Sequence, residues 1–190
     1  MKTGAANTGA GALLAAALVL AGCGGKALPV LGQIPEFQLT AQDGRPFDSR
    51  ALGGKVWVAD FIFTNCPGPC PMMSSRMRQI QTATNGLADV RLVSFTVDPA
   101  HDTPAVLAEY SKHFLAQAGR WYFLTGEQGR LNDLGLNAFH LNKVDGSLDH
   151  STRFTLVDRQ GRIRGYYAFS DDDFPKRLIA DVRALDRERS

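Results

Sequence analysis

This chain has few cysteines, a small net charge and no long apolar run. Each of these features excludes some classes of function. The formal charge of +2 over 190 residues is too small to indicate binding to nucleic acid or to an acidic membrane patch. Hydrophobic residues make up 44% of the sequence and charged residues 21%, as in ordinary soluble globular proteins. The sequence has no internal repeat, and its length fits one domain with a sizeable core.

The N-terminal apolar run is too short to cross a membrane as a helix. It follows Lys2, covers residues 13–21 and falls well below the roughly 20 residues that a bilayer requires. Its length suits the hydrophobic region of a signal peptide. The run ends in Leu20-Ala21-Gly22-Cys23, which resembles the bacterial lipobox, whose cysteine is lipidated and becomes the first residue of the mature protein. A plain secretory signal with an incidental cysteine is the alternative interpretation.

The lipobox interpretation divides the chain into three parts. Residues 1–22 are expected to be a lipoprotein signal peptide, residues 23–33 a tether lipidated at Cys23, and residues 34–190 the domain. The domain would then lie outside the cytoplasm in a bacterial cell envelope, held to the membrane by lipid. The two remaining cysteines, Cys66 and Cys70, form a pair in an oxidising compartment, where disulfides persist.

Residues 34–190 are predicted to form an α/β domain of thioredoxin-like type, with a central mixed sheet flanked by helices and with an N-terminal and a late hairpin. Alternating strands and helices indicate parallel strands joined by right-handed crossovers. The cysteine pair stands where the first buried strand meets its helix, as in thioredoxin-like folds. The expected elements are a hairpin through Asp43-Gly44, strand 55–63, helix 71–84, strand 90–97, a helix opening at Thr103-Pro104, strand 121–124, a helical segment with Leu131 and Leu134, a hairpin over 153–169, and a helix from Phe174.

Each domain cysteine precedes a proline, in the segment Cys66-Pro67-Gly68-Pro69-Cys70-Pro71. A residue before proline tends to avoid helical dihedral angles, and Pro71 suits the first position of a helix. We therefore expect both cysteines to be extended, with Cys70 at or near the helix N-cap. The positive end of the helix dipole would favour its thiolate, the form that binds metals and exchanges disulfides. An inert pair, or a purely stabilising disulfide, is the alternative.

A third ligand would separate metal binding from redox chemistry, and four histidines are candidates. His113 lies in a polar part of the second helix, His101 in a turn, and His140 in a loop, and all three are interpreted as structural or surface residues. His150 is different because it stands just before the strand that starts the late hairpin. In a thioredoxin-like fold, the loop that enters this strand passes beside the cysteines, so His150 is expected to be functional.

Cys66, Cys70 and His150 would supply two sulfurs and one nitrogen. Soft thiolates select Cu(I), and an added imidazole also accommodates Cu(II), whereas zinc could use the same ligands with an open position. The residues alone therefore leave copper, zinc and redox chemistry open. Met72 and Met73 are further soft donors, but both are interpreted as packing residues on the first helix.

Three stretches resemble the signature motifs of the Sco/SenC family. They are Phe63-Thr64-Asn65-Cys66-Pro67-Gly68-Pro69-Cys70-Pro71, the segment Thr96-Val97-Asp98-Pro99-Ala100-His101-Asp102-Thr103-Pro104, and Asp149-His150-Ser151. Leu124-Thr125-Gly126 also stands where that family has its Leu-Thr-Gly. The resemblance covers about residues 34–187, and three ordered motifs make it far more specific than a cysteine pair alone.

The resemblance implies a membrane-tethered, copper-binding chaperone of thioredoxin-like fold. Such proteins deliver copper to, or prepare the thiols of, the copper A site of cytochrome c oxidase. The expected partners are the copper-bearing subunit of the oxidase and other exported copper chaperones. The copper ligands would be Cys66, Cys70 and His150, with the two cysteines also forming a redox-active pair. The family often differs at Asn65, Gly68 and Ala100-His101, none of which is a ligand.

A metallochaperone is favoured over a turnover enzyme, and the alternative is an exported thiol–disulfide oxidoreductase. Ordinary thioredoxins bind substrate backbone with a cis-proline before the late strand, but His150-Ser151-Thr152 contains no proline. A peroxiredoxin-like peroxidase is disfavoured because Thr64 and Cys66 have the wrong spacing for its cysteine loop.

Overall fold

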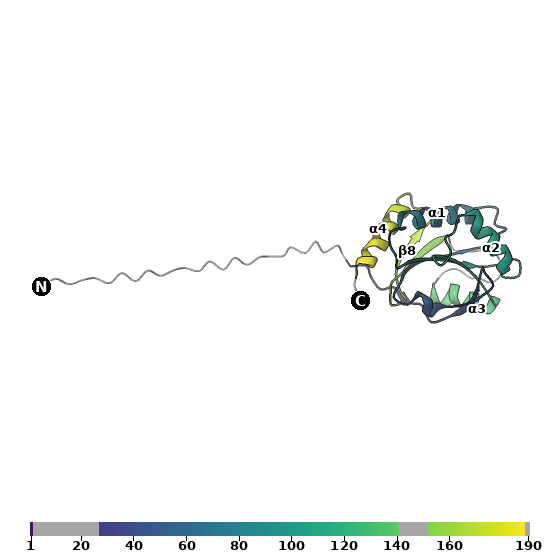
Figure 1. Cartoon of the computed structure of the whole chain (residues 1–190), viewed down its shortest axis with the longest axis horizontal. Helices are drawn as coiled ribbons and strands as arrows, with labels where there is room; N and C mark the ends of the chain where they lie inside the picture. The colour runs from purple at the N-terminus through teal and green to yellow at the C-terminus, as the bar shows by residue number, and fades with distance from the viewer. Residues whose placement is uncertain (2–26, 141–151, 189–190) are drawn as a thin grey trace.

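The computed structural model describes residues 27–140 and 152–188, together with Met1. These residues form a mixed β-sheet flanked by helices on both faces (Figure 1). The elements are β1 (Gly32–Gln33), β2 (Gln38–Ala41), β3 (Pro46–Asp48), the 3₁₀ turn η1 (Ser49–Leu52), β4 (Val56–Ile62), α1 (Pro69–Ala83), β5 (Val90–Thr96), α2 (Pro104–His113), β6 (Trp121–Thr125), α3 (Gln128–Asp133), the π-helical turn η2 (Leu134–Ala138), β7 (Arg153–Val157), β8 (Arg162–Ala168) and α4 (Phe174–Arg187).

The strand order in the sheet is β1-β8-β7-β4-β5-β6-β2-β3. Strands β4, β5 and β6 run parallel, as expected for strands joined through helices, and all other pairs are antiparallel. The predicted N-terminal hairpin is β2–β3 and the predicted late hairpin is β7–β8. These findings confirm the α/β, thioredoxin-like fold class predicted from the sequence.

Strand β4 lies at the centre of this sheet, and every one of its residues is buried. Helices α1, α2 and α4 lie on one face of the sheet, and α3 lies on the other (Figure 1). On the α3 face, Phe139 packs its ring edge-on against Trp57, Phe61 and Phe95. On the opposite face, Phe154 of β7 stacks on Phe174 at the start of α4. A strand covered on both faces explains why residues 55–63 read as an almost continuous apolar run.

Part of the segment predicted to be a tether packs against the domain. Strand β1 pairs with β8 at the edge of the sheet. Leu28 and Pro29 lie just before β1. The guanidinium of Arg164 in β8 donates hydrogen bonds to their main-chain oxygens, at 2.7 Å to Leu28 and 3.2 Å to Pro29. The same side chain, only 5% exposed, reaches Asp158 at 2.9 Å and Glu188 at 3.2 Å. Arg164 therefore holds the N-terminal segment, the β7–β8 turn and the end of α4 together.

Replacement of Arg164 should destabilise the domain, because Asp158 is also buried and would lose one of its two arginine partners. We expect Arg164→Met to lower the free energy of unfolding by about 3 kcal/mol, as when a buried ion pair loses one member. Urea denaturation of the purified protein measures this. The matched control is Arg177→Met, which breaks the exposed pair with Asp171 and should cost less than about 1 kcal/mol. Equal losses of stability in the two variants would contradict the role of Arg164 in holding these three segments together.

Candidate metal and thiol site

The two domain cysteines lie together at the start of α1. Cys70 is the second residue of the helix and is fully buried, whereas Cys66 lies in the loop after β4 and is 7% exposed. The main-chain N–H of Cys70 points at the sulfur of Cys66, with an N to Sγ distance of 3.5 Å. Both side chains are thiols. The structure thus confirms the predicted meeting of the two cysteines between a central strand and its helix.

Helix α1 begins earlier than the sequence predicted. Gly68 is its N-cap and Pro69 its first residue, so the expectations that Cys70 would be extended and that the helix would start at Pro71 are wrong. Cys70 nevertheless lies near the N-cap, as predicted. The first N–H groups of a helix have no partner within it, so prolines in the first turn sacrifice no hydrogen bond. The bias against helical dihedral angles before proline is a preference, and here Cys70 adopts the helix despite Pro71.

The burial of Cys70 opposes the thiolate that the helix dipole was expected to favour. Loss of water raises the pKa of the Cys70 thiol well above its usual value, and the nearby Cys66 and Asp60 raise it further. The expectation that Cys70 favours the thiolate is therefore wrong, because burial favours its neutral thiol. A ligand that binds thiolate must displace a proton from this sulfur.

A buried carboxyl group lies beneath the cysteines, and sequence analysis missed it. Asp60, in the middle of β4, is fully buried and accepts a hydrogen bond from the hydroxyl of Ser94 at 2.6 Å. The indole N–H of Trp121 donates to that hydroxyl at 3.0 Å. Among the described residues, the second carboxyl oxygen of Asp60 has no hydrogen-bond partner. Burial raises the pKa of Asp60 to about 7. An acidic residue inside an otherwise apolar central strand was the available signal.

A second carboxylate, Asp102, anchors the loop that carries Cys66. It is 1% exposed and lies just before α2. The main-chain N–H of Thr64 donates to its two oxygens at 3.3 and 3.2 Å, and the Thr64 hydroxyl donates at 2.5 Å. The hydroxyl of Thr96, at the end of β5, donates to it at 2.5 Å. Sequence analysis placed Asp102 in a family-like motif but gave it no role.

The described histidines lie on the surface, as interpreted from the sequence for His101 and His113. His101 is exposed and pairs with Asp98 at 2.8 Å, and this partner raises the pKa of the imidazole. His140 is also exposed. Across residues 27–140 and 152–188, no three His, Cys, Asp or Glu side chains are arranged to hold a metal ion. Two predicted site residues, His150 and Cys23, lie outside the described residues.

The start of β7 lies beside the end of β4. Trp57 pairs with Val157 and Ala59 with Thr155 in an antiparallel register, so the chain enters β7 near the end of β4 from which the Cys66 loop leaves. Thr152 is the first described residue of the segment that leads into β7. The backbone of the sheet therefore has the arrangement on which the expectation for His150 was based.

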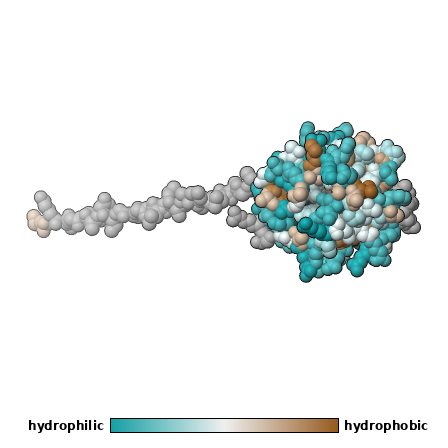
Figure 2. Space-filling view, turned by 45° about the vertical axis from the view of Figure 1, so that its right-hand side comes forward, coloured by the Kyte–Doolittle hydropathy of each residue, from teal (hydrophilic) through white to brown (hydrophobic). Residues whose placement is uncertain are grey.

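The two methionines beyond Cys70 differ in their surroundings. Met73 is fully buried, which agrees with its predicted packing role, but Met72 is 52% exposed. The packing interpretation is therefore wrong for Met72, because this position of α1 faces away from the sheet. In the view of Figure 2, hydrophilic residues cover most of the domain surface and apolar residues are scattered. Within the described part of the chain, no helix is long and apolar enough to cross a membrane.

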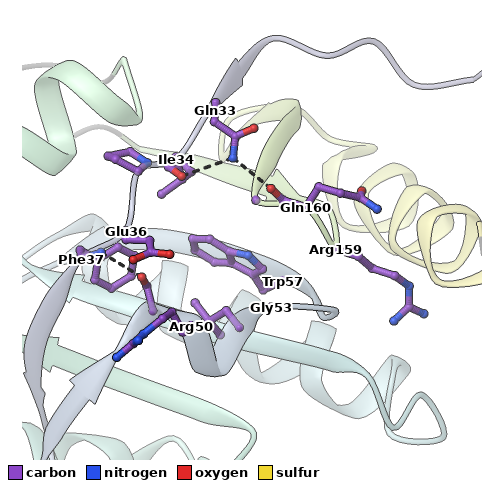
Figure 3. Close-up of a pocket in the computed structure, with 13 residues that line it drawn as sticks. Gln33, Ile34, Glu36, Phe37, Arg50, Gly53, Trp57, Arg159 and Gln160 are labelled. Carbon is purple, nitrogen blue, oxygen red and sulfur yellow. Dashed lines mark hydrogen bonds between the residues drawn. The ribbon is translucent and has the colours of Figure 1, made fainter. Parts of the chain in front are cut away.

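A pocket of about 320 Å³ lies away from the cysteines (Figure 3). Its lining includes Trp57, near the start of β4, together with Gln33, Arg50 and Arg159. The cysteines follow the other end of β4. This pocket therefore belongs to a different part of the domain from the thiol pair.

The sequence and fold match known proteins over most of the chain. The SCO1/SenC family model matches residues 31–186. A SCO1/SenC family lipoprotein from Bacillus anthracis is 34% identical, with a TM-score of 0.74, and the match covers 81% of this chain and 95% of that one. BsSco, a member of the Sco family of cytochrome c oxidase assembly proteins with an identified disulfide switch, is 30% identical, with a TM-score of 0.76 and coverage of 87% and 100%.

A third solved structure contains the metal. ScoI from Bradyrhizobium japonicum with copper bound is 25% identical to this chain, with a TM-score of 0.66, and the match covers 82% of this chain and 99% of that one. The family model alone spans most of the domain, and the fold agrees with it. The chain therefore belongs to the SCO1/SenC family.

Proposed function

We propose that this protein binds copper as cargo through Cys66, Cys70 and His150. Tethered to the membrane by lipid on Cys23, it delivers copper to the copper A site of cytochrome c oxidase or prepares the thiols of that site. One observation carries the proposal: two thiols meet at one helix start, with the N–H of Cys70 3.5 Å from the sulfur of Cys66. The members of the family with known structure support it, since one holds copper and another assists oxidase assembly.

The donor atoms suit a soft ion. Cys66 and Cys70 both belong to the buried core, so a bound ion would be largely shielded from water. Two thiolates favour Cu(I), while hard ions such as magnesium or calcium need several oxygen ligands. The described residues offer no acidic cluster that could supply these oxygens. Copper would bind by replacing the thiol protons, which burial otherwise retains on Cys70.

The position of His150 in the sequence supports its place as the third ligand. It precedes Thr152 by two residues, a separation that extended chain covers in at most about 7 Å. Thr152 leads into β7 beside the end of β4. The imidazole would add a nitrogen to the two sulfurs, which matters more for Cu(II) than for Cu(I).

The same thiol pair supports a second candidate function, that of an exported thiol–disulfide oxidoreductase. Here one thiolate attacks a partner disulfide, and the second thiol then releases the partner as a dithiol. Two electrons pass to the partner, and Cys66 and Cys70 end as a disulfide. The proximity of the two side chains favours this chemistry. The two functions differ in their need for His150: the proposed copper site uses its imidazole as a ligand, whereas disulfide exchange requires only the two thiols.

Loss of either sulfur should abolish tight copper binding. We expect Cys66→Ser and Cys70→Ser each to weaken Cu(I) binding by more than the roughly 10- to 100-fold that loss of an outer-shell partner costs at metal sites. Competition with a Cu(I) chelator, under reducing conditions, measures the affinity and the stoichiometry. Cys23→Ser is the matched control and should bind one copper per domain with unchanged affinity. A serine variant of the pair with wild-type affinity would contradict a shared site.

Loss of His150 should affect Cu(II) more than Cu(I). Two thiolates can hold Cu(I) in near-linear coordination, whereas Cu(II) prefers more ligands and nitrogen among them. We expect His150→Ala to remove the sulfur-to-Cu(II) charge-transfer absorption while weakened Cu(I) binding survives. His101→Ala, at the exposed turn, is the control and should keep the spectrum. An unchanged Cu(II) spectrum in His150→Ala would exclude this ligand and favour the oxidoreductase.

Lipidation of Cys23 should define the mature protein. We expect residues 1–22 to be absent and Cys23 to carry the lipid, because Leu20-Ala21-Gly22-Cys23 follows a short hydrophobic region. Intact-mass analysis of protein extracted from membranes measures both. An unmodified Cys23, or a mature protein that starts elsewhere, would contradict the anchor.

A further inference from the structure

Asp102 connects the end of β5 to the loop that carries Cys66. Its carboxylate is almost fully buried and accepts from Thr64 on one side and Thr96 on the other. Hydrogen bonds to a charged acceptor are stronger than those between neutral groups, and buried ones are the least exposed to competition from water. In the described part of the chain, no salt bridge involves Asp102. The hydrogen bonds from Thr64 and Thr96 compensate its burial.

The two cysteines are held by different means. Cys70 lies in α1 and is fixed by the helix and by the core around it. Cys66 lies outside regular structure, two residues after Thr64. Thr64 attaches to Asp102 through both its main-chain N–H and its hydroxyl. The main-chain N–H of Cys66 also donates to the oxygen of Phe63 at 3.4 Å. The hold of Asp102 on Thr64 is therefore one of the contacts that set the position of the Cys66 loop relative to Cys70.

We propose that Asp102 is a positioning residue that, through Thr64, holds Cys66 in the arrangement suited to two separate thiols. A disulfide requires the two sulfurs to move into bonding contact. The anchor at Thr64 opposes that movement and so favours the dithiol, which is the form that receives copper. The inference deepens the proposed function, on which its copper readout rests, but its effect on the thiol–disulfide equilibrium does not depend on copper.

Thr96 provides the control that separates positioning from stability. Its hydroxyl donates to the same carboxylate at the same distance of 2.5 Å as that of Thr64. It lies at the end of β5, however, and is not part of the Cys66 loop. Thr64→Val and Thr96→Val each remove one hydroxyl with little change of shape. Thr64→Val keeps the main-chain hydrogen bonds to Asp102, so it loosens the Cys66 loop without freeing it. Thr96→Val also removes the acceptor of the Asp98 main-chain N–H. Both should lower the stability of the protein, but only Thr64→Val loosens the Cys66 loop.

The experiment equilibrates full-length wild-type protein and both variants with reduced and oxidised glutathione, then traps and counts the thiols. In this reaction the Cys66–Cys70 dithiol gives two electrons and two protons to oxidised glutathione, which yields two reduced glutathione molecules. We expect Thr64→Val to shift the equilibrium about tenfold toward the disulfide, equivalent to about 30 mV. Thr96→Val should stay within about twofold of wild type, although its thermal midpoint falls. The conservative variant Asp102→Asn keeps one acceptor oxygen and should shift the equilibrium toward the disulfide. Adding Thr64→Val to it should give a total shift smaller than the sum of the two single shifts.

Equal shifts in Thr64→Val and Thr96→Val, or no shift in Thr64→Val, would overturn the inference. Additive shifts in the Asp102→Asn/Thr64→Val double variant would also overturn it, because the two residues would then act separately. Cu(I) affinity, measured in the same variants by chelator competition, should fall in Thr64→Val and not in Thr96→Val. If the wild-type protein binds no copper, the proposed function fails, while the glutathione equilibrium still decides the role of Asp102.

Discussion

The complete burial of β4 is the constraint on which the site depends. Strands β5 and β7 flank it, and helices or aromatic side chains cover both of its faces. Such a strand has very little freedom, so the point where the chain leaves it is fixed in space. The Cys66 loop begins there, and α1 returns from it along the sheet. The fixed end of β4 therefore positions both the loop that carries Cys66 and the helix that carries Cys70.

The two cysteines of the site differ in their exposure to water: Cys70 is fully buried and Cys66 is slightly exposed. Burial favours the neutral thiol of Cys70 and keeps it away from water, which lowers the reactivity of this sulfur because thiolates are the reactive form. Cys66 is slightly more open and lies in a loop, so it is the sulfur better placed to meet an incoming ion or a partner thiol first. Copper handling and thiol exchange would then use the same entry, which is why both candidate functions fit one pair of residues.

Hydrophobic patterns and the positions of glycine and proline predicted the strands other than β1, both hairpins and the meeting of Cys66 with Cys70, because these features depend on local sequence. Strand β1 falls in the segment predicted to be a tether, and it forms through pairing with β8, which is distant in sequence. The start of α1 was predicted two residues late, since the rule for residues before proline describes a preference that the surrounding structure can override. Asp60 and Asp102 escaped functional assignment for another reason. Their importance comes from Ser94, Thr64 and Thr96, which are distant in sequence, and no local pattern reveals such partnerships.

The contacts of Arg164 with Leu28 and Asp158 fix where the N-terminal segment joins the domain, relative to the thiols. It fixes Leu28 beside Asp158, where β7 ends next to the start of β4, whereas the thiols follow the far end of β4. The seven residues of that strand span about 23 Å. Leu28 follows Cys23 by five positions, a leash of at most about 18 Å. With lipid on Cys23, the membrane would be attached within this leash of the sheet end opposite the thiols.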